Sequence, residues 1–157
     1  MSNSILKEVY KNVFEKDFDS SKFEERLKMQ KMVYLLQNMG ISIGDYNFLW
    51  YKHGPYSQVL QNDILSEEDI KPIDLKYSND AKKEIDKLKK AMAEENLHYS
   101  QAEWIECLGS LLYIKENVLS SSSNEDDIIK ELKKRKPHLD NDTDNKKAFS
   151  ILDGLIA

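Results

Sequence analysis

The chain has 157 residues, 40% of them hydrophobic and 32% charged, a balance typical of one folded domain with a strongly solvated surface. Its net charge of -5 disfavours a protein that coats DNA, because phosphate neutralisation needs concentrated Lys and Arg. A lone cysteine excludes an intramolecular disulfide and suits a reducing compartment. Without a signal-peptide pattern or a membrane-spanning apolar run, we expect a cytoplasmic protein.

Helical periodicity dominates the first forty residues. The first segment predicts a helix, capped by Ser2 or Ser4, because its apolar residues recur at helical spacing: Ile5, Leu6, Val9, Tyr10, Val13 and Phe14. A second helix is expected from Ser21, which forms a capping-box pattern with Glu24, to Gly40. Its second half should be almost entirely buried, judging by these apolar positions: Phe23, Leu27, Met32, Tyr34, Leu35, Leu36 and Met39.

After a predicted turn between Gly40 and Gly44, the spacing of the apolar residues changes from a helical to a strand-like pattern. Aromatic residues alternate over 46–52, which predicts a strand buried on both faces. The sequence His53, Gly54, Pro55 should end that strand, since proline lacks the donor that a strand or helix needs. A helix capped by Ser57 is expected next, with Leu60 and Ile64 pointing inward. Pro72 limits 70–75 to a short edge strand at most.

The second half of the chain predicts four more helices. After Asn79 comes a charged helix whose apolar face holds Ala81, Ile85, Leu88 and Met92. Ser100 and Glu103 form a capping box before a long helix with two apolar stripes, which predicts a central helix covered on most sides. A flexible link is expected at 119–124. The C-terminal helical pair, 125–157, should have a cap at Asn124 and a break at Pro137.

These elements favour a mainly α fold: a compact helical domain with a short β element, winged-helix-like, in which residues 1–157 form a single domain. Few glycines and prolines leave little room for many short strands. No internal repeat is visible.

Catalytic chemistry has little support in the sequence. Glycine-rich phosphate loops, HExxH, CxxC and GxSxG motifs are all missing. His53, His98 and His138 each lack a second ligand at helical spacing, and Cys107 lies on an apolar helix face, where a buried structural thiol is favoured. Two acidic clusters should complement helix dipoles rather than catalyse: Glu67, Glu68 and Asp69, and Glu125, Asp126 and Asp127. We therefore expect no enzyme, no cofactor and no metal site.

Two segments are candidate binding sites. The first is an aromatic corner around Gly-Pro, which either packs on the core or forms an exposed contact patch: Trp50, Tyr51, His53, Gly54, Pro55 and Tyr56. The second is a basic run that could bind anions or DNA, although cations at a helix C-terminus are favourable without any ligand: Lys130, Lys133, Lys134, Arg135 and Lys136.

The segments RLKMQKMVYLLQNMG (26–40) and YNFLWYKHGPYSQVL (46–60) together resemble the Panacea and SocA-like group of small bacterial proteins, and more closely the related YwgA-like proteins. The hallmark is a Leu-x-x-Gln-Lys helix, an aromatic strand and a Gly-Pro corner, carried here by Leu27, Gln30, Lys31, Tyr34, Phe48, Tyr51, Gly54, Pro55 and Tyr56. The resemblance covers a third to a half of the chain. It implies a non-enzymatic helical binding module in toxin–antitoxin, phage-defence or proteolytic-adaptor settings.

The leading hypothesis is a protein-binding module, antitoxin-like or an accessory of prophage or defence systems, whose aromatic corner covers a protein partner such as a toxin. The alternative is a winged-helix transcriptional regulator that contacts DNA through the helix after Ser57 or through the basic run at 130–136. A hydrolase or nuclease is a third hypothesis, but no residue in the sequence is assigned to such a site.

Overall fold

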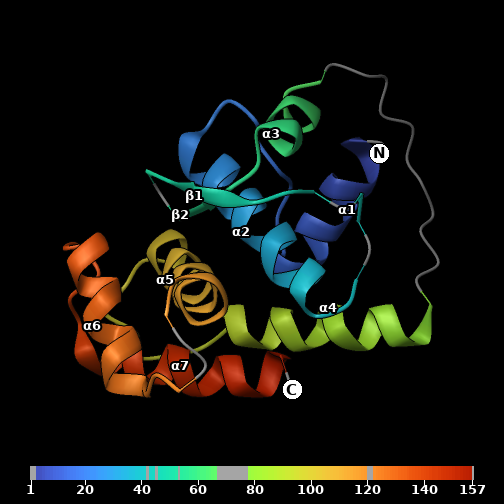
Figure 1. Cartoon of the computed structure of the whole chain (residues 1–157). Coiled ribbons are helices and arrows are strands. Elements are labelled where there is room, and N and C mark those ends of the chain that lie inside the picture. Colours follow the sequence, from blue (N-terminus) through green and yellow to red (C-terminus); the bar gives the residue numbers. More distant parts are fainter. Residues whose placement is uncertain are drawn as a thin grey trace.

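The computed structural model describes residues 3–41, 43–44, 46–52, 54–66, 78–119 and 122–156. Helices make up most of this part of the chain, together with one small antiparallel sheet (Figure 1). The prediction of a mainly helical fold with a short β element is therefore confirmed.

The elements follow one another as a helical pair, a β-hairpin with a short helix, and a second helical group. In chain order they are α1 (Asn3–Phe14), α2 (Phe23–Asn38), β1 (Leu49–Tyr51), β2 (Gly54–Tyr56), α3 (Gln58–Ile64), α4 (Asn79–Met92), α5 (Gln101–Tyr113), the π-helical turn η1 (Ile114–Val118), α6 (Glu125–Arg135) and α7 (Asp142–Ile156).

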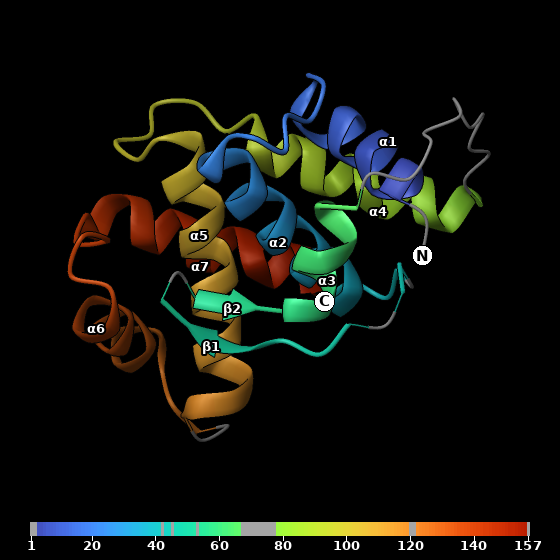
Figure 2. The same cartoon turned by 90° about the horizontal axis from the view of Figure 1, so that it is seen from above.

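Helix α5 lies at the centre of the fold, as predicted. It contacts α2, α4, α6, α7 and β2, and every residue from Trp104 to Leu112 is buried. Figure 2 shows the hairpin lying across α5, with α6 and α2 on opposite sides of it. The predicted capping box is present: Glu103 N–H donates to Ser100 Oγ at 3.2 Å, and Ser100 N–H donates to Glu103 Oε1 at 3.0 Å.

Helix α2 is the second core helix, and its buried second half is confirmed from Lys31 to Leu36. It ends in a Schellman motif, since Ile41 N–H donates to Leu36 O and Gly40 has a φ of +93°. The start of α2 differs from the prediction. Ser21 does not cap it, because Asp19 Oδ1 accepts hydrogen bonds from both the N–H and the hydroxyl of Ser21, and the helix begins two residues later.

The aromatic segment is a β-hairpin, and the prediction of one strand buried on both faces is wrong. Leu49–Tyr51 pairs antiparallel with Gly54–Tyr56, so the Gly-Pro corner is itself the second strand. Leu49 is 72% exposed and Tyr51 is 54% exposed, whereas Trp50 is partly buried and packs against the core. A two-stranded sheet packs only one face on the core, and alternation then exposes every second side chain.

The remaining sequence predictions are mostly confirmed. The side chains of Ser57 and Asn124 cap α3 and α6, and α6 ends before Pro137. The acidic triplet from Glu125 to Asp127 occupies the first turn of α6. Five predictions concern residues or side chains outside the described part of the chain: the cap of α1, the acidic cluster at 67–69, the strand at 70–75, the link residues 120–121 and the binding role of His53.

Two glutamines of α2 hold the segment that contains the hairpin. Gln30 donates from Nε2 to Ser57 O at 2.9 Å and accepts from Ser57 N–H at 3.0 Å. Two helical turns later, Gln37 makes the same pair of bonds to Tyr46, at 2.7 and 2.9 Å. Each side-chain amide thus bonds both backbone groups of one residue, which fixes the two ends of 46–57 along one helix.

Gly54 is the position in the hairpin that we expect to tolerate no side chain. Its φ is +91°, and an added Cβ would lie 2.6 Å from Ser110 Oγ. We expect Gly54→Ala to lower the free energy of unfolding by about 2–3 kcal/mol, measured by urea denaturation. Gly154→Ala, in open space on α7, should instead raise it by about 0.5–1 kcal/mol. Equal stability of Gly54→Ala and the parent chain would contradict this account.

Candidate binding surface at the hairpin

Two buried lysines hold the inner side of the hairpin. Lys31 of α2 is 1% exposed and donates from Nζ to Pro55 O at 2.8 Å. Lys136, at the end of α6, is also buried and donates from Nζ to Lys52 O. The two ammonium groups therefore bind one backbone carbonyl in the hairpin turn and one in β2, and fix the hairpin on α2, α5 and α6.

Glu106 of α5 supplies the buried negative charge in this region. Its carboxylate lies 3.9 Å from Lys136 Nζ and 2.9 Å from His138 Nε2. It is 3% exposed, whereas the His138 side chain remains half exposed. Buried charges are tolerated when paired and hydrogen-bonded, so this cluster of Lys31, Glu106, Lys136 and His138 has a structural explanation without catalysis.

Burial changes the acidity of both lysines. Desolvation lowers the pKa of Lys31 from 10.5 to about 7; the charge of Glu106 acts in the opposite direction, and that of Lys136 lowers it further. The pKa of Lys136 is also lowered, again by burial, and again Glu106 partly opposes the change. Keeping Lys31 protonated therefore lowers the stability of the folded state near neutral pH.

We expect this cost to appear as a pH dependence of stability. Between the folded pKa of about 7 and the unfolded value of 10.5, the unfolded state binds more protons at Lys31, so stability rises with pH. From about pH 7.5 to about pH 8.5, the parent chain should gain about 1 kcal/mol per pH unit relative to Lys31→Met. Urea denaturation at several pH values measures this. The exposed control Lys134→Met should follow the parent, and parallel curves for all three proteins would disprove the assignment.

Trp50 joins the two segments that the sequence singled out separately. Its ring lies 5.5 Å from that of Tyr113, and the Arg135 guanidinium and Lys136 ammonium lie 5.1 and 5.2 Å from its centroid. The aromatic corner and the basic run are thus neighbours, held together by cation–π contacts. Trp50 is half-buried and is largely engaged inside the protein.

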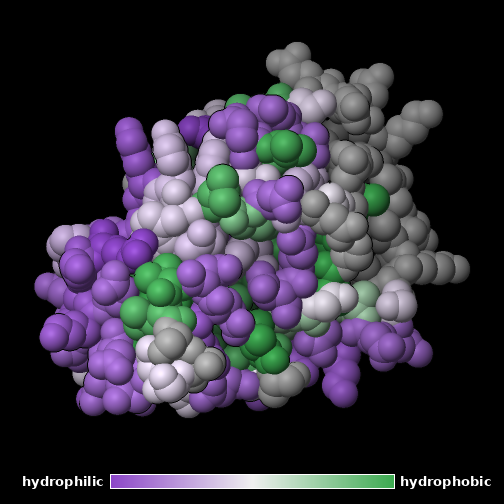
Figure 3. Space-filling model, in the orientation of Figure 1, coloured by the Kyte–Doolittle hydropathy of each residue, from purple (hydrophilic) through white to green (hydrophobic). Residues whose placement is uncertain are grey.

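The outer face of the hairpin is apolar and accessible. Leu49 and Tyr56 are cross-strand partners, and the rings of Tyr51 and Tyr56 lie 5.3 Å apart. Together with Phe23, which is 51% exposed at the start of α2, these residues form what we call the hairpin surface. Figure 3 shows hydrophobic side chains over the hairpin and over α3, surrounded by hydrophilic ones.

A pocket of about 250 Å³, the hairpin pocket, opens between α2, the hairpin and α3. Its lining combines aromatic rings, two amides and three basic side chains: Phe23, Arg26, Leu27, Gln30, Lys31, Tyr51, Lys52, Tyr56 and Gln61. Tyr51 and Tyr56 of the predicted aromatic corner therefore line a hollow as well as the surface beside it.

The structure divides the predicted contact residues into two groups. Tyr51 and Tyr56 reach the hairpin surface, whereas Gly54 and Pro55 are buried and serve the architecture. Sequence reasoning missed Phe23, Arg26 and Leu49 as surface residues. Leu49 and Tyr51 are two residues apart, so they lie on the same face of the strand. The sequence prediction placed that face in the interior, whereas it is exposed.

Much of the predicted basic run is engaged within the protein. Lys136 is buried, Arg135 pairs with Glu131 at 2.9 Å, and Lys133 pairs with Asp142 at 3.0 Å. Lys130 and Lys134 are exposed, and neither makes an ion pair with a described residue. Two of the five predicted cations are thus fully available to an anionic ligand.

Other polar groups have structural roles. Cys107 is buried, as predicted, and burial raises the pKa of its thiol, which disfavours the nucleophilic thiolate. The buried carboxylate of Asp144 accepts from the N–H groups of His98 and Tyr99 at 2.7 and 2.9 Å, which joins α7 to the segment before α5. Among the described residues, no group of three His, Cys, Asp or Glu side chains is arranged to hold a metal ion.

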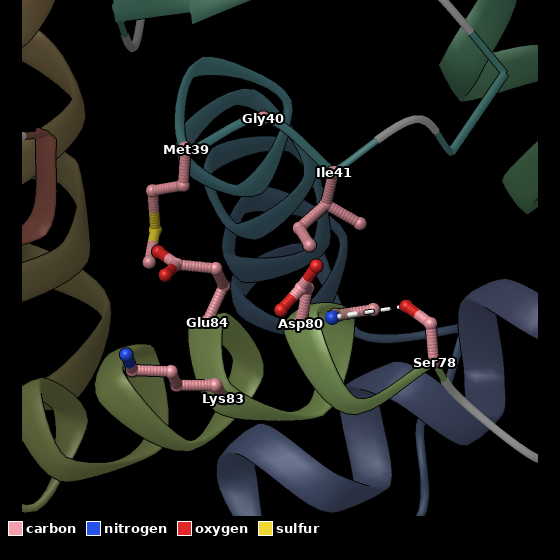
Figure 4. A pocket seen from close by; sticks show the side chains of 8 residues that line it. Met39, Gly40, Ile41, Ser78, Asp80, Lys83 and Glu84 are labelled. Carbon is pink, nitrogen blue, oxygen red and sulfur yellow. Dashed lines mark hydrogen bonds between the residues drawn. The ribbon is translucent and has the colours of Figure 1, made fainter.

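A larger pocket, about 510 Å³, lies elsewhere, between the end of α2 and the start of α4. Figure 4 shows Asp80 and Glu84 of α4 pointing toward Ile41 and Met39, with Lys83 extending along the helix beside them and the Ser78 hydroxyl capping the helix. Its lining mixes opposite charges with apolar groups. We assign it no ligand.

None of the described helices has both the length and the apolar character that a membrane crossing requires. No protein-family model, curated protein or solved structure matches this chain. The resemblance to Panacea and SocA-like proteins therefore stays a prediction, and the surface itself has to support any functional proposal.

Proposed function

We propose that this protein is a non-catalytic module that binds a protein partner through the hairpin surface. One observation carries the proposal. The large hydrophobic side chains exposed among the described residues all come from α2, the hairpin and α3 with its C-cap: Phe23, Leu49, Tyr51, Val59 and Leu65. Exposed apolar groups that gather in one region of a charged protein are characteristic of an interaction site.

The rigidity of the hairpin supports this function. Gln30, Lys31 and Lys136 fix its backbone from the inner side, so Tyr51 and Tyr56 are presented without further ordering of the chain. Preorganisation lowers the entropic cost of association, and tyrosine supplies a large contact area with few rotatable bonds. A partner that covers this surface would be blocked sterically, with no chemical step.

The biological setting is proposed from the sequence resemblance. A toxin, or a component of phage defence or of proteolysis, would be the protein partner in a cytoplasmic complex, and the chain would act as an antitoxin-like neutraliser or an accessory protein. A stable interface of this kind should bury more than about 1,000 Å² of total surface.

Capture of partners from the host tests the proposal. The tagged parent chain, Tyr51→Ala and the exposed α6 control Lys134→Ala are compared, and the affinity of any stoichiometric protein partner is measured. We expect Tyr51→Ala to weaken binding at least about tenfold, as for an interface hot spot, and Lys134→Ala to leave it unchanged. A folded Tyr51→Ala protein with unchanged affinity would contradict the assignment.

A DNA-binding regulator is the second proposal, favoured by the exposed Lys130 and Lys134 and by a hairpin that is followed directly by a helix. Its binding should fall steeply as salt increases, because phosphate contacts release counterions. Lys130→Glu combined with Lys134→Glu should then abolish DNA retardation in a gel at low salt. No retardation by the parent chain would remove this proposal.

A further inference from the structure

The hairpin pocket is basic in a protein that is acidic overall. Among the described residues, Arg26, Lys31 and Lys52 line it and no Asp or Glu does, whereas the whole chain carries a net charge of -5. Among the described residues, neither Arg26 nor Lys52 forms an ion pair; Arg26 donates to Ser20 O at 2.8 Å and lies 5.8 Å from the Phe23 ring centroid. Within the described part of the chain, these two cations therefore line a hollow of aromatic rings and amides without a paired carboxylate.

The size of the pocket indicates its occupant. At about 250 Å³ it falls below the roughly 300–1,000 Å³ typical of small-molecule sites. One large side chain fits this volume, and the rings of Phe23, Tyr51 and Tyr56 offer aromatic contacts. Anchors of this kind, inserted into a pocket and surrounded by polar contacts, dominate the binding energy of many protein interfaces.

We propose that the hairpin pocket receives one aromatic side chain from an acidic segment of the partner protein. Asp or Glu residues flanking this anchor would pair with Arg26 and Lys52 at the rim. The inference rests on the proposed function and adds the chemistry of the partner. Charge complementarity at the rim would steer the acidic segment toward the pocket and exclude basic competitors.

Proteins that bind single-stranded nucleic acid also use aromatic rings and cationic side chains, but the geometry of this pocket favours a peptide. Nucleic acid requires a positive groove that follows a backbone over several nucleotides, with rings available for successive bases. Here the Tyr51 and Tyr56 rings pack against each other at 5.3 Å, around one small hollow with Arg26 and Lys52 at its rim.

Three pentapeptides test the chemistry directly on the full-length chain, labelled with ¹⁵N and followed by NMR. We expect EDWDE to shift amide signals around the pocket and to bind at least about tenfold tighter than EDADE, which lacks the anchor, or KKWKK, which reverses the charge. Similar affinities for the three peptides, signal changes confined to other surfaces, or tighter binding of oligothymidylate would overturn the proposal.

Charge reversal then identifies the responsible cations. Lys52→Glu should weaken EDWDE binding at least about tenfold, whereas Lys134→Glu, an equal change of charge at an exposed position of α6, should leave it within about twofold. Arg26→Glu should weaken binding as Lys52→Glu does. Arg26 also donates a hydrogen bond to Ser20 O, so if the Arg26→Glu protein does not fold, the result for Lys52→Glu alone decides the test. Unchanged binding by folded Lys52→Glu would refute the role of the rim.

The captured partner separates this inference from the proposed function. A protein partner lost on Tyr51→Ala but bound equally by Lys52→Glu would support a hairpin interface and overturn the acidic anchor. A partner lost on both substitutions would support both statements. If EDWDE binds the pocket as expected while no protein partner is captured, the pocket chemistry stands and the proposed function fails.

Discussion

Replacing Glu106 with leucine is expected to lower the free energy of unfolding by about 3–5 kcal/mol. The substitution removes the carboxylate beside Lys136, 3.9 Å away, and the charge that opposes the depressed pKa of Lys31. Both lysines are buried against hairpin carbonyls, so Lys136 would lose the carboxylate that compensates its charge, and the pKa of Lys31 would fall further, which adds the cost of removing its proton. Chemical denaturation near neutral pH measures the loss.

The surface pair Glu131–Arg135 provides the matched control. Glu131→Leu removes a carboxylate that lies 2.9 Å from its partner but is partly solvated, and should cost less than about 1 kcal/mol. A triple variant with Lys31→Met, Lys136→Met and Glu106→Leu should regain much of the stability lost by Glu106→Leu alone, because the buried charges of the cluster are removed together. If Glu106→Leu is no less stable than Glu131→Leu, the buried cluster is not what holds the hairpin.

The second large effect is expected at Gln30, where alanine should destabilise the protein by about 2–3 kcal/mol. Gln30 accepts from the buried Ser57 N–H and donates to Ser57 O, which also accepts from Gln61 N–H. The carbonyl would therefore keep one hydrogen bond, whereas the N–H would lose the amide oxygen that it bonds now. A buried donor left unsatisfied costs its full desolvation energy. Thermal and urea denaturation report the change.

Gln37 makes the same two bonds to Tyr46 but is only partly buried, so water can replace its amide in the alanine variant. We therefore expect Gln37→Ala to cost clearly less than Gln30→Ala. The hairpin amide signals should shift in Gln30→Ala, because Ser57 directly follows β2. Equal losses in the two variants would show that the burial of the glutamine amide is irrelevant.

Sequence patterns predicted the helices well because each depends on neighbours in the chain. Four-residue spacing placed the buried faces of α4 and α6, and the side-chain caps at Ser57, Ser100 and Asn124 are local hydrogen bonds that a short motif specifies. Where a local competitor was overlooked, the prediction failed: Asp19 takes the hydrogen bonds of Ser21 and shifts the start of α2.

The candidate site was predicted only in part. Tyr51 and Tyr56 were named as contact residues and do lie at the surface, but the same segment includes Gly54 and Pro55, which are buried. Phe23 was assigned to the buried face of α2 and is 51% exposed. An apolar residue looks the same in a sequence whether a neighbour covers it or not, because the covering element comes from a distant part of the chain.

Spacing and capping act over a few residues, so the helical class, most helix ends and the lack of a recognisable catalytic motif could be read from the amino-acid order alone. The packing of the helices was needed to place Lys136 beneath the hairpin, to bring Trp50 against Arg135 and to form one pocket from α2, the hairpin and α3. These contacts join residues far apart in the chain, and they follow from the packing of several elements around α5.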